Sequence, residues 1–150
     1  MDQRNGDVGP SVEVGQEIPA LDAGPFSLLD FVRWAAYQEN WIRLHYDREY
    51  TVQHLGLPDV VQSGHHRTAL IVRMLTDWLG SAGELRRLRI RHEAVVLPGD
   101  AIRCGGRITG LTQTPERMQV TLQVWAARQD GIAVSEGEAV VDVTLSRGAR

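Results

Sequence analysis

The segment between Asn40 and Asp47 holds the residues best suited to proton chemistry. It reads Asn-Trp-Ile-Arg-Leu-His-Tyr-Asp. His45 is its only side chain that both accepts and donates a proton near neutral pH. Asn40 cannot take a proton, but its amide can accept a hydrogen bond from a water and donate one. The pair predicts a site where an imidazole moves protons while an amide orients a water.

Simpler roles stay open for each of these residues. His45 could hydrogen-bond its own loop, and Asn40 could form a turn. Asp47 is the carboxylate nearest to His45 in the chain and could contact a substrate. It could also cap a helix that follows it.

Two further histidines, His65 and His66, suggest a metal site together with His45. Adjacent residues on a helix point about 100° apart. No cysteine or carboxylate stands beside them at the spacing of metal ligands. We therefore expect no bound metal and no cofactor.

Three predicted helices position these residues. Ser27 can cap a helix over 28–38, and a short helix over 48–55 would end at Gly56. A third helix is expected over 64–79, closed by Gly80. Its apolar residues surround most of the circumference, which predicts a long helix enclosed by the rest of the fold.

Beyond this third helix the apolar residues recur with a period of two. Alternation over 87–94, 102–108, 118–126 and 138–145 predicts four strands, the last three in an antiparallel meander. A buried helix followed by half-buried strands indicates an α+β fold, with an antiparallel sheet wrapped around the central helix.

Composition limits what the chain can be. With 150 residues, of which 43% are hydrophobic, it forms one globular domain, expected over 18–150 after a flexible leader over 1–17. All 16 basic residues are arginine, which excludes a Schiff-base lysine. The net charge of −3 argues against a nucleic-acid binder.

The chain also lacks the sequence features of a membrane or secreted protein. Its longest uninterrupted apolar run is about four residues, far short of the roughly 18 that a membrane span needs. Its first residues do not form a signal peptide. The single cysteine, Cys104, suits a reducing compartment, so we expect a cytoplasmic protein.

Three local signatures resemble the MaoC-like acyl-CoA hydratases and dehydratases, the R-specific enoyl hydratases with a hot-dog fold. The segment 40–50 resembles their hydratase motif. The segment 56–64 is similar to the loop that enters their central helix, and Val96-Leu97-Pro98-Gly99-Asp100 resembles their turn after the following strand. Two positions depart from the family: Asn40 replaces a usual aspartate, and Ser63 a usual histidine.

The resemblance implies that the chain hydrates an enoyl thioester or dehydrates a 3-hydroxyacyl thioester, carried by coenzyme A or an acyl carrier protein. His45 would move the proton, Asn40 would orient the water, and the Gly64 N–H would bind the thioester oxygen. Ser63 could hydrogen-bond the substrate or cap the helix, and Gly64 could simply be a loop-to-helix glycine.

The resemblance also implies a partner, because hot-dog domains commonly pair as homodimers or heterodimers. A non-catalytic partner subunit of a heteromeric hydratase is the alternative function, and Asn40 in place of aspartate favours it. Three arginines on one strand could meet coenzyme A phosphates or form a solvated, ion-paired face; these are Arg87, Arg89 and Arg91.

Overall fold

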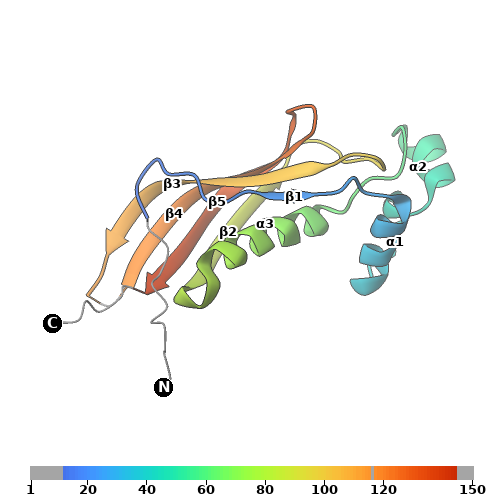
Figure 1. The fold of residues 1–150 in the computed structure, drawn as a ribbon. Coiled ribbons are helices and arrows are strands. Elements are labelled where there is room, and N and C mark those ends of the chain that lie inside the picture. The colour runs from blue at the N-terminus through green and yellow to red at the C-terminus, as the bar shows by residue number, and fades with distance from the viewer. Residues whose placement is uncertain (1–11, 116, 145–150) are drawn as a thin grey trace, which may run out of the picture.

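The structure, a computed structural model, describes residues 12–115 and 117–144. A curled five-stranded sheet lies over one long helix, α3 (Gly64–Leu79). Two shorter helices, α1 (Leu28–Tyr37) and α2 (Arg48–Leu55), lie beyond the N-terminal end of α3 (Figure 1). The predicted α+β arrangement is confirmed, as is the predicted extent of the central helix.

All strand pairs in the sheet are antiparallel, in the order β1-β3-β4-β5-β2. The strands are β1 (Leu21–Ala23), β2 (Gly83–His92), β3 (Ile102–Gln113), β4 (Arg117–Arg128) and β5 (Ala133–Thr144). The four predicted strands are present, and β3, β4 and β5 form the predicted meander. The short strand β1 was not predicted, since three residues are too few to show an alternation.

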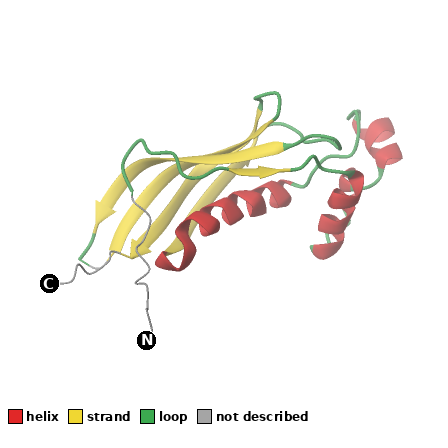
Figure 2. Cartoon of the chain, in the orientation of Figure 1, coloured by secondary structure: helices red, strands yellow, loops and turns green. Residues whose placement is uncertain are grey.

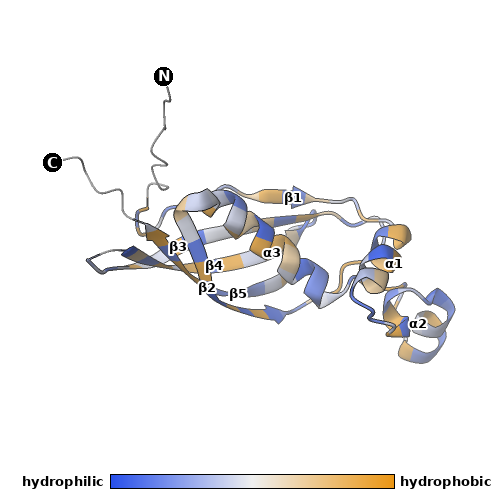
Figure 3. Ribbon diagram, turned by 90° about the horizontal axis from the view of Figure 1, so that it is seen from below, coloured by the Kyte–Doolittle hydropathy of each residue, from blue (hydrophilic) through white to orange (hydrophobic). Residues whose placement is uncertain are grey.

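The predicted wrapping of the sheet around α3 is confirmed. The sheet covers one face of α3, and the side chains buried there are Arg67, Ile71, Met74, Leu75 and Leu79. Elsewhere on the helix, Leu70, Val72 and Trp78 stay half-buried. Leu70 and Trp78 pack against the same core, and the exposed residues of α3 are polar: His65, Arg73, Thr76 and Asp77. Figure 3 shows hydrophilic and hydrophobic residues mixed along α3.

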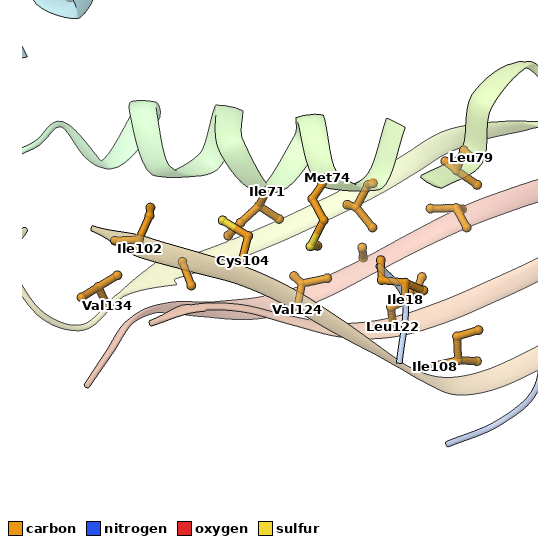
Figure 4. Close-up of a cluster of buried hydrophobic side chains, with 14 of the residues drawn as sticks. Ile18, Ile71, Met74, Leu79, Ile102, Cys104, Ile108, Leu122, Val124 and Val134 are labelled. Carbon is orange, nitrogen blue, oxygen red and sulfur yellow. The ribbon is translucent and has the colours of Figure 1, made fainter. Parts of the chain in front are cut away.

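The core lies between α3 and the concave face of the sheet. Ile71 and Met74 point from the helix towards Cys104 and Val124 on the strands (Figure 4). Burial raises the pKa of the Cys104 thiol to about 12. A thiol that stays protonated at neutral pH is a packing residue and not a nucleophile.

Most of the predicted leader, residues 1–11, lies outside the described residues. The end of that segment pairs with β3: the Gly15 N–H donates to the Ile108 carbonyl at 2.8 Å, and Glu17 forms a bridge with Arg107. Ile18 is buried in the core. Within the described residues, no helix is long and apolar enough to cross a membrane.

Local signals explain the start of α1. The Ser27 hydroxyl accepts from the Asp30 N–H at 3.3 Å, while the Asp30 carboxylate accepts from the Ser27 N–H at 2.7 Å. This capping box satisfies two N–H groups that a helix start leaves free. The short 3-10 helices η1 (Arg43–His45) and η2 (Gly80–Ala82) complete the set of elements, and Figure 2 shows the loops that join them.

Candidate functional site

The predicted site residues lie around the N-terminal end of α3, where α1, η1 and the loop after α2 meet. Asn40 follows α1, and its N–H donates to the Ala35 carbonyl at 2.9 Å. Its side chain lines a cleft of about 580 Å³ formed by Gln38, Glu39, Asn40, Ile42 and His65. The structure thus places the Asn40 amide in one cleft with the second residue of α3.

The Asn40 side chain also has a local contact. Its Oδ1 accepts from the Ile42 N–H at 3.4 Å, the geometry of a weak turn. A hydrogen bond of that length is at the outer limit of the usual range. The turn-forming role and a role in the cleft are therefore compatible.

His45 is buried on η1, with 8% of its surface exposed. Its Nδ1 lies 2.8 Å from the Val61 carbonyl oxygen. Since a carbonyl only accepts, Nδ1 carries the hydrogen and donates it. The neutral ring therefore keeps its basic lone pair on Nε2, which is the arrangement that a general base requires.

A second hydrogen bond fixes His45 against the entry to α3. The Val61 N–H donates to the Leu44 carbonyl at 3.1 Å. Both the N–H and the carbonyl of Val61 therefore bind η1. Val61 precedes Gly64 by three residues, a separation of at most about 10 Å along the chain. His45 is therefore held against the loop that leads into α3.

Ser63 and Gly64 form the start of α3. Ser63 is buried at the N-cap position, but its hydroxyl makes no capping hydrogen bond. Among the residues that the structure describes, the Gly64 N–H has no acceptor. A free N–H at a helix start carries positive partial charge and can bind an anionic oxygen.

Asp47 performs the capping role that was the alternative for it. Its Oδ1 accepts from the Tyr50 N–H at 3.0 Å at the start of α2, and its Oδ2 accepts from Arg43 at 2.8 and 2.9 Å. The bond from Tyr50 and then the one from Arg43 lower the pKa of this carboxyl. Both oxygens are thus held by the protein, and substrate binding by Asp47 stays a prediction.

The two adjacent histidines of α3 diverge as expected. His65 faces the cleft, whereas the His66 ring stacks on Trp34 with centroids 4.4 Å apart. The Gln62 amide donates to His66 Nδ1 at 3.1 Å, and burial lowers the pKa of His66. Across residues 12–115 and 117–144, no cluster of three metal-ligating side chains is present.

Sequence reasoning missed His92, which lies directly against Gly64. A Cβ on Gly64 would come within 2.5 Å of both Cδ2 and Nε2 of His92. The space beside Gly64 is thus filled by an imidazole. The missed signal was one polar residue in the inward-facing series Leu88, Ile90, His92 and Ala94.

The arginines of β2 contact carboxylates. Arg87 lies 3.2 Å from Glu138, and Arg91 forms an ion pair with Glu93. Their side chains are exposed, which is the solvated, ion-paired face considered above.

Comparisons with known proteins agree with this architecture. A family model described as "MaoC like domain" matches residues 11–129. Among solved structures, a chain of the ChsH1-ChsH2 complex from Mycobacterium tuberculosis is 20% identical, with a TM-score of 0.78, over 89% of this chain and 99% of that chain. No curated protein matches.

Two other solved structures are similar. An (R)-hydratase from A. caviae involved in PHA biosynthesis is 24% identical, with a TM-score of 0.77, over 90% of this chain and 98% of that chain. A protein described as a MaoC-like dehydratase is 27% identical, with a TM-score of 0.75, over 90% of this chain and 41% of that longer chain. With its hot-dog fold and a family match over most of its length, the chain belongs to the MaoC-like domain family.

Proposed function

We propose that the chain catalyses the reversible hydration of an enoyl thioester, the reverse reaction being dehydration of the 3-hydroxyacyl thioester. The observation that carries this proposal is the hydrogen bond from His45 Nδ1 to the Val61 carbonyl at 2.8 Å. It leaves Nε2 as the basic nitrogen, close to a helix start with a free N–H. Membership of a family that includes hydratases and dehydratases supports the same reaction.

The proposed mechanism uses one proton carrier. His45 Nε2 takes a proton from a water while the water oxygen bonds to the β-carbon of the enoyl group. The double-bond electrons move onto the thioester oxygen, where the Gly64 N–H stabilises the enolate charge. His45 then returns the proton to the α-carbon, so that the net change is the addition of one water.

Asn40 orients the attacking water in this scheme. Its amide can hold a water from the cleft that it lines with His65, but it cannot share the proton transfer as a carboxylate would. The whole proton transfer therefore falls to His45. Ser63, buried and free of a capping bond, is a candidate for a hydrogen bond to the substrate.

A substrate screen tests the proposal. Purified protein is mixed with crotonyl-, mesaconyl- and longer enoyl-CoA thioesters, and loss of the conjugated double bond is followed by absorbance. We expect hydration of at least one of these thioesters, or of the same acyl groups on an acyl carrier protein. Absence of turnover on every thioester, with and without a partner chain, would contradict the proposal.

A second candidate function is that of a non-catalytic partner subunit. Two observations favour it: the amide at Asn40, and the edge strand β2, whose outer side has no paired strand among the described residues. An unpaired ten-residue edge is commonly covered by another chain. Turnover only after addition of a second hot-dog chain from the same organism would favour this function.

Pairing along β2 has its own test, whichever function is correct. We propose a homodimer or a heterodimer of hot-dog chains. Sedimentation at micromolar concentration should give a dimer, and the amides on the outer side of β2 should exchange slowly with solvent. A stable monomer with rapidly exchanging β2 amides would contradict pairing of this chain with itself.

A further inference from the structure

His92 lies where a substrate bound at Gly64 would have to pass. Its Nε2 is 2.5 Å from the position that a Gly64 Cβ would occupy. Adding the C–C bond of about 1.5 Å puts Nε2 no more than about 4 Å from the Gly64 Cα. The His92 residue is exposed at the end of β2.

Ser135 fixes the ring of His92. The two residues are direct partners in the register of β2 and β5, and His92 Nδ1 lies 2.9 Å from Ser135 Oγ. Ser135 is fully buried, and within the described residues its hydroxyl has His92 Nδ1 as its one hydrogen-bond partner. A buried hydroxyl needs an acceptor for its hydrogen, so Ser135 donates to Nδ1. The neutral ring must then carry its hydrogen on Nε2, which together with Cδ2 forms the ring edge against Gly64.

The surroundings of His92 disfavour the charged ring. Burial, then the nearby Arg67 and His65, lower the pKa of His92. Arg67 is itself buried, with 6% of its surface exposed, and donates to the carbonyls of Ala94 and Val134. Its contacts are with neutral carbonyls, so its positive charge remains to act on His92.

We propose that His92 is a catalytic residue whose Nε2–H joins the Gly64 N–H in donating a hydrogen bond to the thioester oxygen. This inference rests on the proposed hydration reaction and adds a residue to it. A neutral imidazole can donate to an oxygen that gains negative charge without transferring its proton. Two donors that converge on one oxygen form an oxyanion hole, and loss of one such donor usually lowers kcat by about 10²–10³-fold.

The tautomer of His92 can be tested without any substrate. Long-range ¹H–¹⁵N correlation spectra of the labelled protein, assigned by comparison with His92→Phe, report which ring nitrogen carries the hydrogen. We expect the Nε2–H form in the wild type, and the Nδ1–H form in part of the Ser135→Ala molecules. A wild-type ring protonated on Nδ1 alone would overturn the inference.

Kinetics test the catalytic role on whichever enoyl thioester the wild type hydrates. His92→Phe keeps a ring but removes the donor, so kcat should fall about 10²-fold with a smaller change in KM. His92→Gln keeps an N–H donor at similar reach and should retain more activity than His92→Phe. The matched control is His54→Phe, since His54 lies on α2 and stacks on Tyr50; its kcat should not change.

The outcomes separate this inference from the proposed function. Wild-type hydration with unchanged kcat in both His92 variants would overturn the inference and leave the function intact. Absence of hydration by the wild type under all conditions would contradict the function itself. Should His92→Phe fail to fold, His92→Gln serves both as the kinetic variant and as the reference that assigns the His92 signals, because it keeps a polar side chain towards Ser135 of β5.

Discussion

The imidazole of His92 occupies the space that any side chain on Gly64 would need: a Cβ there would lie 2.5 Å from its Nε2 and Cδ2. The close approach of His92 therefore gives a packing reason for glycine as the first residue of α3. This contact joins β2 to the start of α3 and places two candidate donors side by side.

Because of this contact, we expect substitutions at Gly64 and His92 to have non-additive effects on the free energy of unfolding. Gly64→Ala should lower the free energy of unfolding by about 1–2 kcal/mol, since the ring of His92 must move and lose its bond to Ser135. In a His92→Ala background the same change should cost nothing, because alanine favours a helix over glycine by about 0.8–1 kcal/mol. Urea titration of the four proteins checks this, and equal costs in both backgrounds would contradict the contact.

Asp47 offers a separate test of a structural role. Asp47→Ala should lower the free energy of unfolding by about 1 kcal/mol through loss of the α2 cap, with kcat nearly unchanged. Asp47→Asn retains a capping oxygen and should cost less. A large fall in kcat for the well-folded Asp47→Asn protein would instead return Asp47 to the substrate site.

We expect the buried His66 to make the folded protein less stable in acid. Burial lowers its pKa in the folded chain below the ordinary value of 6.5. The unfolded chain therefore binds a proton at this histidine more readily than the folded chain does. For this reason the contribution of neutral His66 to stability is complete above pH 6.5 and is lost as the pH falls through the folded-state pKa. His92 acts in the same direction.

The measurement is the free energy of unfolding between pH 7.5 and pH 5. We expect it to fall with pH in the wild type and to fall less in His66→Phe, which keeps an aromatic ring beside Trp34. If the free energy of unfolding fell equally with pH in the two proteins, the pKa of His66 would not be lowered by folding.

The sequence predicted the elements that local signals define. Gly64 and Gly80 mark both ends of α3, and period-two alternation marks β2 to β5. The contact between Gly64 and His92 could not be predicted in the same way, because it joins residues 28 positions apart through the packing of β2 against α3. The apolar circumference of α3 predicted that the sheet wraps around it, although the sequence does not show how much of the helix one sheet covers.

The same distinction between local signals and contacts of distant residues applies to the candidate site. Residues in one continuous segment, such as Asn40 and His45, could be proposed from their types and spacing. The bond from His45 to Val61 depends on how η1 packs against a loop 16 residues later, and it is this bond that assigns the hydrogen to Nδ1. The sequence therefore indicated a candidate proton carrier, and the structure supplies its tautomer.

Asn40→Asp tests the role assigned to the amide. A carboxylate near His45 would stabilise the imidazolium and could share the proton transfer. Activity should survive or increase, and the acidic limb of the pH–rate profile should move to higher pH. Asn40→Ala is the control and should lower kcat by less than His45→Ala does. A complete loss of activity in a folded Asn40→Asp protein would contradict the water-orienting role.

In the proposed mechanism His45 carries the proton, so kcat for hydration of an enoyl thioester is measured for the wild type and His45→Ala. We expect a fall of about 10²-fold or more, the usual scale for a positioned acid–base group. His45→Gln, which can still donate to Val61, should be as inactive while retaining more of the stability, and His54→Ala should match the wild type. Full activity of His45→Ala on a thioester that the wild type hydrates would contradict the mechanism.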